Sequence, residues 1–234
     1  MSTTSVPTSA PANYEVRRRR MTAFVADVIV LCEAPGARAD LRSGLGRPVD
    51  HCGRMHRYLA WRVSQGQHDE RAYYAVAALI AARPRSARDA DAERNAGPVG
   101  ETSPTEGAAP DEASPVVDAE RPDDYSTASW RNRPNLGVSL ALAVRDARMK
   151  EDSAENRLRL LTRQSTTSVH PRLPALIRYL LGSGIAVDWA VLLDDLSGWD
   201  LYRDRIATRW LQSFYRTLHA PPVTNPANTE NENS

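Results

Sequence analysis

Arginine carries most of the chemistry that this sequence offers. Lys150 is the only lysine among 30 basic residues, so all the others are arginines. A guanidinium group presents a rigid fork of donors that can bind one phosphate through two parallel hydrogen bonds. The placement of the arginines therefore indicates where a phosphate backbone could bind, although a bias in codon usage would produce the same composition.

Helical phase, at about 100° per residue, separates outward-facing arginines from the apolar stripes of the predicted helices. Arg145, Arg163 and Arg178 are predicted to point away from those stripes, and Arg148 flanks its own. Arg157 falls at the edge of a leucine stripe, so we expect it to be partly buried and paired with an acid or a helix carboxyl end. The outward rows fit phosphate binding, and they also fit surface salt bridges that only keep the chain in solution.

A run of four arginines at 17–20 is predicted to begin the first helix. Positive charge in a first turn opposes the helix dipole and costs stability unless an anion lies nearby. The run therefore favours a polyanion or an acidic partner, and the alternative is a solvated junction between a tail and the helix.

Metal-binding and catalytic chemistry has little support in the sequence. His51, Cys52 and His56 lie close together, but the two histidines are five residues apart rather than four, and no CxxC pair supports them. The GLGRPV segment at 44–49 lacks the last glycine of a dinucleotide fingerprint and follows no strand. We expect no catalytic residue, no metal and no cofactor, and we place the other histidines at the surface: His68, His170 and His219. A small helical enzyme with a histidine–carboxylate site stays open as an alternative.

The net charge of +1 hides two parts of opposite charge. Residues 89–124 hold 11 acidic and 2 basic residues among many Pro, Gly, Ala and Ser, whereas the rest of the chain holds 28 basic and 18 acidic residues. So polar a stretch cannot bury enough apolar surface to offset the entropy of ordering it. We expect a disordered acidic insertion over 89–128 and disordered tails over 1–13 and 220–234. We also expect the insertion to shield the basic surface from non-specific nucleic acid.

The remaining sequence predicts helices, because apolar residues recur at helical spacing and the alternation typical of strands is hardly seen. The expected helices span 15–33, part of 37–49, 51–63, 69–84, 136–148, 153–164, 171–181, 188–198 and 199–218. Ser153 and Asp188 are predicted N-caps, and the nearly all-apolar 69–84 is predicted to be central in its bundle. The predicted fold class is all-α, with an N-terminal lobe at 14–88 and a C-terminal lobe at 129–219, two helical bundles joined by the acidic insertion.

The sequence favours a protein of the cytoplasm. The sequence contains no run of about 18 apolar residues, which a transmembrane helix would need, and the N-terminus lacks the pattern of a secretory signal. Cys32 and Cys52 do not make a disulfide framework, which fits a reducing compartment. We therefore expect a cytoplasmic protein with no membrane partner.

Several motifs, taken in their order along the chain, resemble a known family. They are LRSGLGRP at 41–48, LGVSLALAVRDAR at 136–148, ENRLRLLT at 155–162, LPALIRYLLGSGIAVDWAVLLDDLSGW at 173–199 and TRWLQSFY at 208–215. Together they resemble the CasB family, the small subunit of the type I-E CRISPR surveillance complex called Cascade. The resemblance covers most of 15–218, and its C-terminal motifs are the most specific part because their order and spacing are hard to obtain in a generic bundle.

The resemblance implies an all-helical, two-lobed protein without catalytic activity. Family members lie as a pair among the other Cascade subunits, along the hybrid of guide RNA and target DNA. Their basic surface is implied to hold the hybrid and the displaced DNA strand, which stabilises the R-loop. The family's basic positions correspond here to Arg42, Arg47, Arg145 and Arg157, and helical phase adds Arg148, Arg163 and Arg178.

The sequence departs from the family pattern in an insertion at about 85–128, in its two ends, and in the poorly matching segment 50–68. These departures affect the expected geometry of the first lobe. An alternative function is a helical protein–protein adaptor whose basic face meets acidic partners. The salt dependence of binding distinguishes nucleic-acid binding from an adaptor function, because phosphate binding weakens steeply with salt and a mostly apolar protein contact does not.

Overall fold

The computed structural model describes residues 10–66, 68–84, 87, 130 and 132–221. Within these ranges the regular structure is helical and contains no strand. The predicted acidic insertion at 89–128 lies outside the described residues, as do the first nine residues and 222–234. The all-α fold class predicted from the sequence is confirmed.

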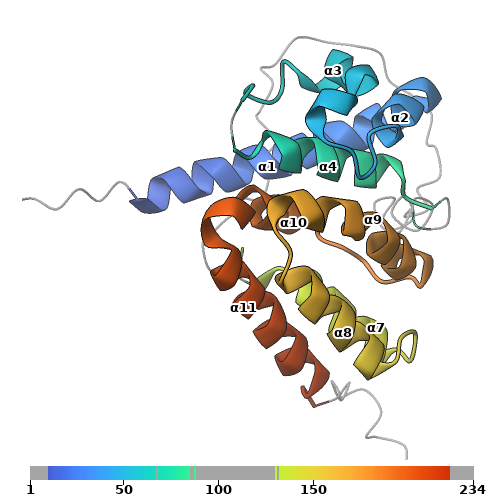
Figure 1. The fold of residues 1–234 in the computed structure, drawn as a ribbon, viewed down its shortest axis with the longest axis vertical. Coiled ribbons are helices and arrows are strands. Elements are labelled where there is room, and N and C mark those ends of the chain that lie inside the picture. Colours follow the sequence, from blue (N-terminus) through green and yellow to red (C-terminus); the bar gives the residue numbers. More distant parts are fainter. Residues whose placement is uncertain (1–9, 67, 85–86, 88–129, 131, 222–234) are drawn as a thin grey trace, which may run out of the picture.

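The helices form two lobes (Figure 1). The N-terminal lobe contains α1 (Ala10–Leu31), α2 (Pro35–Arg42), the 3-10 helix η1 (Val49–His51), α3 (Gly53–Leu59) and α4 (Glu70–Ala81). The C-terminal lobe contains α7 (Leu136–Arg145), α8 (Glu151–Thr162), α9 (Thr166–Gly182), α10 (Trp189–Ser197) and α11 (Trp199–Leu218).

Helix α4 is the centre of the N-terminal lobe. Nine of its 12 residues are buried, and it packs against α1, α2 and α10. A helix covered on several sides must be apolar around most of its circumference, which explains the sequence of this segment. Its predicted central position is confirmed.

Helices α7 and α11 lie against each other in the C-terminal lobe and bury the largest aromatic side chains. Trp199, Trp210 and Phe214 are almost completely buried. Beside them lies the buried carboxylate of Asp195, which accepts a 2.6 Å hydrogen bond from Trp210 Nε1 and forms an ion pair with Arg209. An internal charge of this kind is tolerated because it is both paired and hydrogen-bonded.

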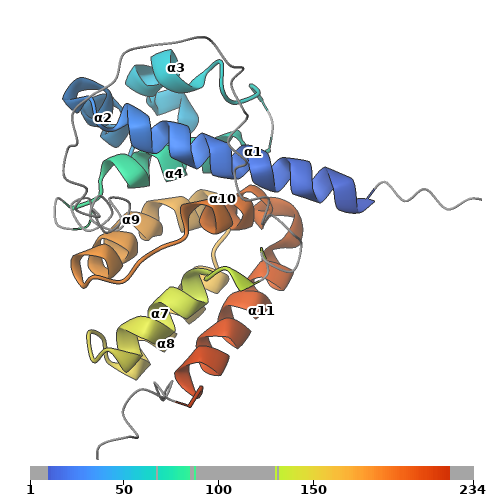
Figure 2. The same ribbon diagram turned by 180° about the vertical axis from the view of Figure 1, so that it is seen from behind.

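The two lobes share one hydrophobic core. Helix α10 packs against α1 and α4, and Figure 2 shows α1 lying along the boundary between the lobes. An ion pair of 3.3 Å joins Arg17 Nε of α1 to Asp194 Oδ1 of α10 across that boundary. Because buried apolar residues of both lobes form one continuous cluster, the lobes are not independent bundles.

Helix α1 begins earlier than predicted. Its first residue is Ala10, so the expected disordered tail at 1–13 is wrong in its last four residues. The prolyl residue Pro11 is compatible with this start, because a first-turn residue has no intrahelical use for the missing N–H. The arginine run at 17–20 therefore lies about two turns inside the helix, beyond the first turn, in which positive charge would be unfavourable. Arg17 finds its acidic partner within the chain, in Asp194.

The predicted N-caps have different outcomes. Asp188 is confirmed, since its carboxylate accepts hydrogen bonds of 3.1 Å from the backbone N–H groups of Ala190 and Val191. Ser153 is wrong, because α8 begins two residues before it at Glu151, with Lys150 at the N-cap position. The first turn of α8 contains two acids, which the helix dipole favours there.

Helix α9 begins at Thr166 rather than at 171, and it contains Pro171 and Pro174. Pro171 has no N–H to donate to the carbonyl of Thr167. Arg71 of α4 supplies the missing donor, since its Nη2 lies 3.3 Å from the Thr167 oxygen. A proline that normally marks a helix start is thus accepted inside α9 because the other lobe provides a hydrogen bond.

Candidate nucleic-acid interface

All seven arginines predicted from the sequence as binding residues are exposed. Arg42 lies at the end of α2 and Arg47 in the loop after it. Arg145 lies at the end of α7 and Arg148 in the α7–α8 turn. Arg157 lies within α8, Arg163 at the C-cap of α8 and Arg178 within α9. Arg148 is therefore in a turn, although its phase was derived for a helix. The backbone N–H groups of Arg148 and Met149 both donate to the Ala143 carbonyl, which closes α7.

Tyr179 of α9 brings two of these arginines together. Its hydroxyl donates a hydrogen bond to the backbone carbonyl of Arg148, and the guanidinium carbon of Arg157 lies 5.3 Å from the centre of its ring. Arg178 precedes Tyr179 on α9, and we group it with them for its place in the chain rather than for a contact. We call Arg148, Arg157, Arg178 and Tyr179 the Tyr179 cluster. Tyr179 was not among the residues predicted from the sequence, although an aromatic residue beside an outward arginine was the available signal.

The structural role predicted for Arg157 is wrong. Its side chain is exposed and makes no ion pair with a described acidic residue; its contact is the Tyr179 ring. The buried stripe of α8 is narrow and consists of Ala154, Leu158 and Leu161, so a residue at its edge reaches solvent. A guanidinium over an aromatic face is held in place and keeps its charge available.

Arg145 and Arg163 do not join the Tyr179 cluster. Arg145 Nη1 donates a 3.1 Å hydrogen bond to the carbonyl of Thr217 in the last turn of α11, which suits a cation at a helix carboxyl end. Arg163 lies at the opposite end of α8 from the α7–α8 turn, and a helix of 12 residues is about 18 Å long.

The loop that carries Arg47 lies on α9 of the other lobe. A Cβ atom at Gly46 would be 3.6 Å from Pro171 Cα and 3.8 Å from Pro174 Cγ, and Gly46 has a φ of 73°, which favours glycine. The Sγ of Cys52 donates to the carbonyl of Pro48 at 3.3 Å and fixes the far end of the loop. The LRSGLGRP motif thus places Arg47 beside the helix that also carries Arg178.

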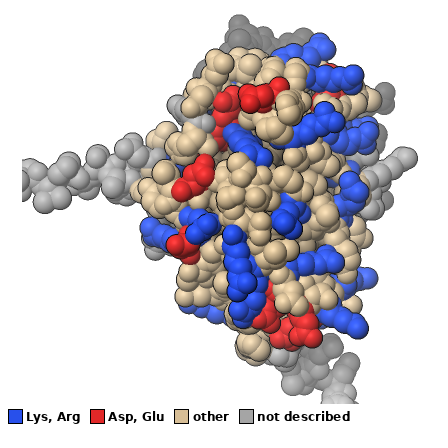
Figure 3. Space-filling view, in the orientation of Figure 1, with Lys and Arg blue, Asp and Glu red and all other residues tan. Residues whose placement is uncertain are grey.

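Basic side chains follow one edge of the molecule. In Figure 3, Lys and Arg atoms line the right-hand edge from the level of α2, past α9, to the α7–α8 end, where acidic atoms, among which the first turn of α8 contributes two exposed acids, lie beside them. Six of the predicted arginines have neither an ion pair nor a side-chain hydrogen bond with any described residue: Arg42, Arg47, Arg148, Arg157, Arg163 and Arg178. Their charges are available to an external anion.

Other arginines are neutralised within the chain. Arg133 binds Asp188 through two hydrogen bonds of 2.6 and 2.8 Å, and Arg159 pairs with Glu155 at 2.6 Å. The Tyr215 hydroxyl and Arg159 together lower the pKa of the Glu155 carboxyl. The charge of an arginine in this protein therefore depends on its neighbours, and sequence composition alone overstates the basic surface.

The candidate metal and nucleophile residues have ordinary structural roles. His56 Nδ1 lies 2.9 Å from the hydroxyl of Tyr74, His51 is exposed, and burial raises the pKa of the Cys52 thiol. Among the described residues no group of three or more His, Cys, Asp and Glu side chains could hold a metal. The helices that the structure describes include none long and apolar enough to span a membrane.

His170 was expected at the surface and is instead 2% exposed, between α9 and α4. Burial, and next the charge of Arg71, lower its pKa to about 4. Its helix extends farther toward the N-terminus than predicted, which moves this residue from a loop into the core side of α9.

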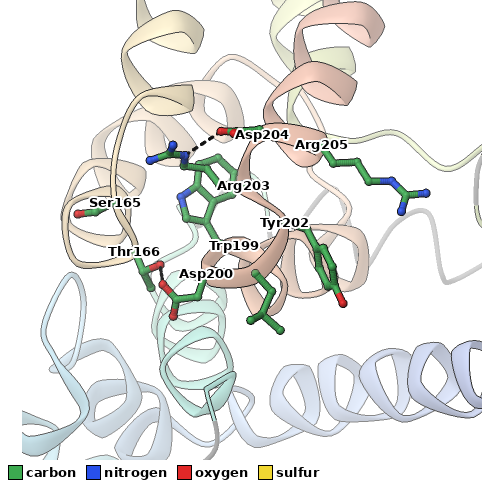
Figure 4. A pocket seen from close by; sticks show the side chains of 9 residues that line it. Ser165, Thr166, Trp199, Asp200, Tyr202, Arg203, Asp204 and Arg205 are labelled. Atoms are coloured by element: carbon green, nitrogen blue, oxygen red, sulfur yellow. Dashed lines mark hydrogen bonds and ion pairs between the residues drawn. The ribbon is translucent and has the colours of Figure 1, made fainter.

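A pocket of about 520 Å³ lies where α10 turns into α11 (Figure 4). Several of its polar groups are engaged with each other or with backbone: Thr166 Oγ1 donates to Asp200, Arg203 Nε lies 3.2 Å from Asp204 Oδ1, and Trp199 Nε1 donates to the Gln164 carbonyl at 3.1 Å. Its lining contains no histidine, cysteine or lysine.

Fold and surface together define an all-helical, two-lobed protein with exposed arginines that no described acid neutralises. The family model of the CRISPR-associated protein Cse2 matches residues 37–215. The chain belongs to this family, and the resemblance stated from its motifs is confirmed.

Solved structures of similar fold agree with this assignment. One chain, from a structure described as "CRISPR RNA-guided surveillance complex, pre-nicking", is 35% identical with a TM-score of 0.66 over 86% of this chain and 94% of its own. A second, from a "CRISPR RNA-guided surveillance complex", is 34% identical with a TM-score of 0.64 over 86% and 95%. The crystal structure of M. ruber CasB shares the fold at 23% identity, with a TM-score of 0.55 over 85% and 94%. No curated protein matches the chain by sequence.

Proposed function

We propose that this chain is a non-catalytic subunit of a type I-E CRISPR surveillance complex that holds nucleic-acid backbones. It acts in the cytoplasm, beside the other Cascade subunits and a second copy of itself. The observation that carries the proposal is the set of exposed arginines without a described acidic partner, which spans both lobes. The family and the surveillance complexes of the related chains support the same conclusion.

The ligand in this proposal is the sugar–phosphate backbone of the R-loop: the hybrid of guide RNA and target DNA, and the displaced strand. Exchanging a DNA duplex for a hybrid of equal length is nearly balanced in free energy, so a few backbone contacts can tip it. Contacts of arginine with phosphate do not depend on base sequence. They therefore suit a subunit that must accept any guide.

The Tyr179 cluster provides the sharpest test of this function. We replace its three arginines in one variant, Arg148→Gln, Arg157→Gln and Arg178→Gln, and measure target-DNA affinity of the assembled complex at about 50 to 200 mM salt. Each lost phosphate contact should reduce the slope of log affinity against log salt by about one, so the triple variant should lose up to about three.

A matched control removes the same number of charges elsewhere on the surface. Arg159, Arg203 and Arg216 are exposed but engaged with Glu155, Asp204 and Gln212. Their triple replacement by Gln should leave the slope within about one of wild type. Equal losses in both variants would mean general electrostatics and would overturn the proposal. Loss of complex assembly at unchanged slope would favour the adaptor alternative instead.

A further inference from the structure

Trp61 is the most exposed of the large apolar side chains that the structure describes. It is 72% exposed, whereas the other four tryptophans, Trp130, Trp189, Trp199 and Trp210, are all buried. Leaving an indole in water forgoes the free energy of burying one of the largest apolar side chains. Such a ring at a fixed place on the surface indicates a contact that is made with another molecule.

The ring of Trp61 is held from one side only. The guanidinium carbon of Arg62 lies 3.7 Å from its centre. Arg62 is itself fixed, because its Nη1 donates a 2.8 Å hydrogen bond to the Tyr58 carbonyl and its Nε lies 3.7 Å from Asp27 Oδ2. One face of the indole therefore rests on a fixed cation, and its exposure leaves the other face open for stacking.

Two exposed arginines lie on the same side of the helical turns that lead to Trp61. Arg54 and Arg57 of α3 precede it by seven and four residues, the spacing that brings side chains to one side of a helix. Helix α3 ends at Leu59, and Trp61 follows in a turn that continues its course, since Ala60 keeps helical φ and ψ and the backbone N–H of Arg62 donates to the Leu59 carbonyl. Arg54 has no ion pair with a described residue. Arg57 lies 3.9 Å from Asp40 Oδ2 and 5.1 Å from the centre of the Tyr58 ring, and its side chain stays 71% exposed. A stacking surface with two cations beside it matches the combination of base and phosphate in a single strand.

We propose that Trp61, Arg54 and Arg57 form a stacking platform for an unpaired nucleotide of single-stranded nucleic acid. The open indole face stacks on a base, and the two arginines bind the phosphates that follow along α3. Base stacking on an aromatic ring is tolerant of sequence. A duplex hides its base faces, so the platform separates single strands from duplexes. This inference rests on the proposed function, to which it adds a specific contact on the N-terminal lobe.

Tryptophan fluorescence of the full chain tests the platform directly. Because Trp61 is the only exposed indole, oligo(dT) at low salt should quench the emission of the wild type through this residue. Trp61→Ala should abolish the quenching and weaken oligo(dT) binding by about 5- to 100-fold. Trp61→Phe should keep most of the affinity because it retains a ring. Binding of duplex DNA should be the same in all three proteins.

The outcomes separate this inference from the proposed function. If Trp61→Ala binds oligo(dT) as the wild type does, the platform is wrong, whereas the function still stands if the Tyr179 cluster controls the salt slope. If Trp61→Ala weakens single strands and duplexes equally, the platform is also wrong, because stacking is not what was lost. If the variant fails only to assemble with the other subunits, Trp61 is a protein contact and the inference is overturned.

Discussion

The boundary between the lobes and the edge formed by α2, α9 and the α7–α8 turn use the same residue type in opposite ways. At the boundary and along α10 and α11, arginines meet acids: Arg17 with Asp194, and Arg209 with Asp195. Along the edge, Arg47 and Arg148 meet no described acid. The comparison teaches that acids, rather than arginines, decide which part of this surface holds the protein together and which part is left for a ligand.

The strongest way to break the comparison is to remove the buried acid. Asp195→Asn should lower the free energy of unfolding by about 3 kcal/mol, mainly because the buried hydrogen bond from Trp210 loses its charged acceptor; the half-exposed Arg209, which also loses its counter-charge, adds less because water screens it. Urea denaturation measures the change. The control Asp204→Asn, at a carboxylate that is 91% exposed, should change it by less than about 0.5 kcal/mol. A similar loss in both variants would contradict the distinction.

Acid should weaken the boundary through His170. Its pKa is about 4 in the folded chain and about 6.5 when unfolded, so the unfolded chain binds more protons between these values. The folding free energy that depends on this residue is fully present above about pH 6.5 and is lost as the pH falls toward 4. Arg71 and Asp200 are the charged groups that act on it.

The measurement compares urea denaturation of the wild type and His170→Leu from pH 7 to pH 4. The wild type should lose up to about 3 kcal/mol more than the variant over this range. His219→Leu, at an exposed histidine, should follow the wild type. Parallel curves for the wild type and His170→Leu would show that this group does not couple to folding.

Tyr179 tests whether the edge is organised or merely exposed. Tyr179→Phe removes the hydroxyl that holds the Arg148 carbonyl and should weaken binding of an RNA–DNA hybrid about threefold. Tyr179→Leu also removes the ring beneath Arg157 and should weaken it about tenfold. Hybrid affinity at fixed salt measures both. Equal affinities for the two variants and the wild type would mean that each arginine acts alone.

The smallest expected effect concerns folding. Arg148→Gln and Arg178→Gln should each change the free energy of unfolding by less than about 0.5 kcal/mol, because neither side chain has a described partner to lose. Thermal denaturation checks this. If either variant lost more than about 1 kcal/mol of the free energy of unfolding, that arginine would stabilise the fold and would not be left free for a ligand.

Helical periodicity predicted most elements of this fold correctly, since the apolar stripes of α7, α10 and α11 are set by residues close in sequence. Local signals also found the cap at Asp188. They failed where a distant element decides: Arg71 lets α9 continue through Pro171, and Tyr179 determines where Arg157 lies. The candidate arginines could be found by phase, but their pairing could not, because Arg17 and Asp194 are far apart in the chain.

The hydrogen bond between Arg71 and the Thr167 carbonyl makes the C-terminal lobe depend on the N-terminal lobe for part of its structure. The Thr167 carbonyl finds its donor only when α4 is present, and α10 also needs α1 and α4 to cover its apolar surface. A chain cut between the lobes should therefore yield two fragments that associate tightly when mixed and aggregate when kept apart. A longer connection between the two halves should therefore cost little stability, whereas neither half should fold when it is transferred alone into another protein.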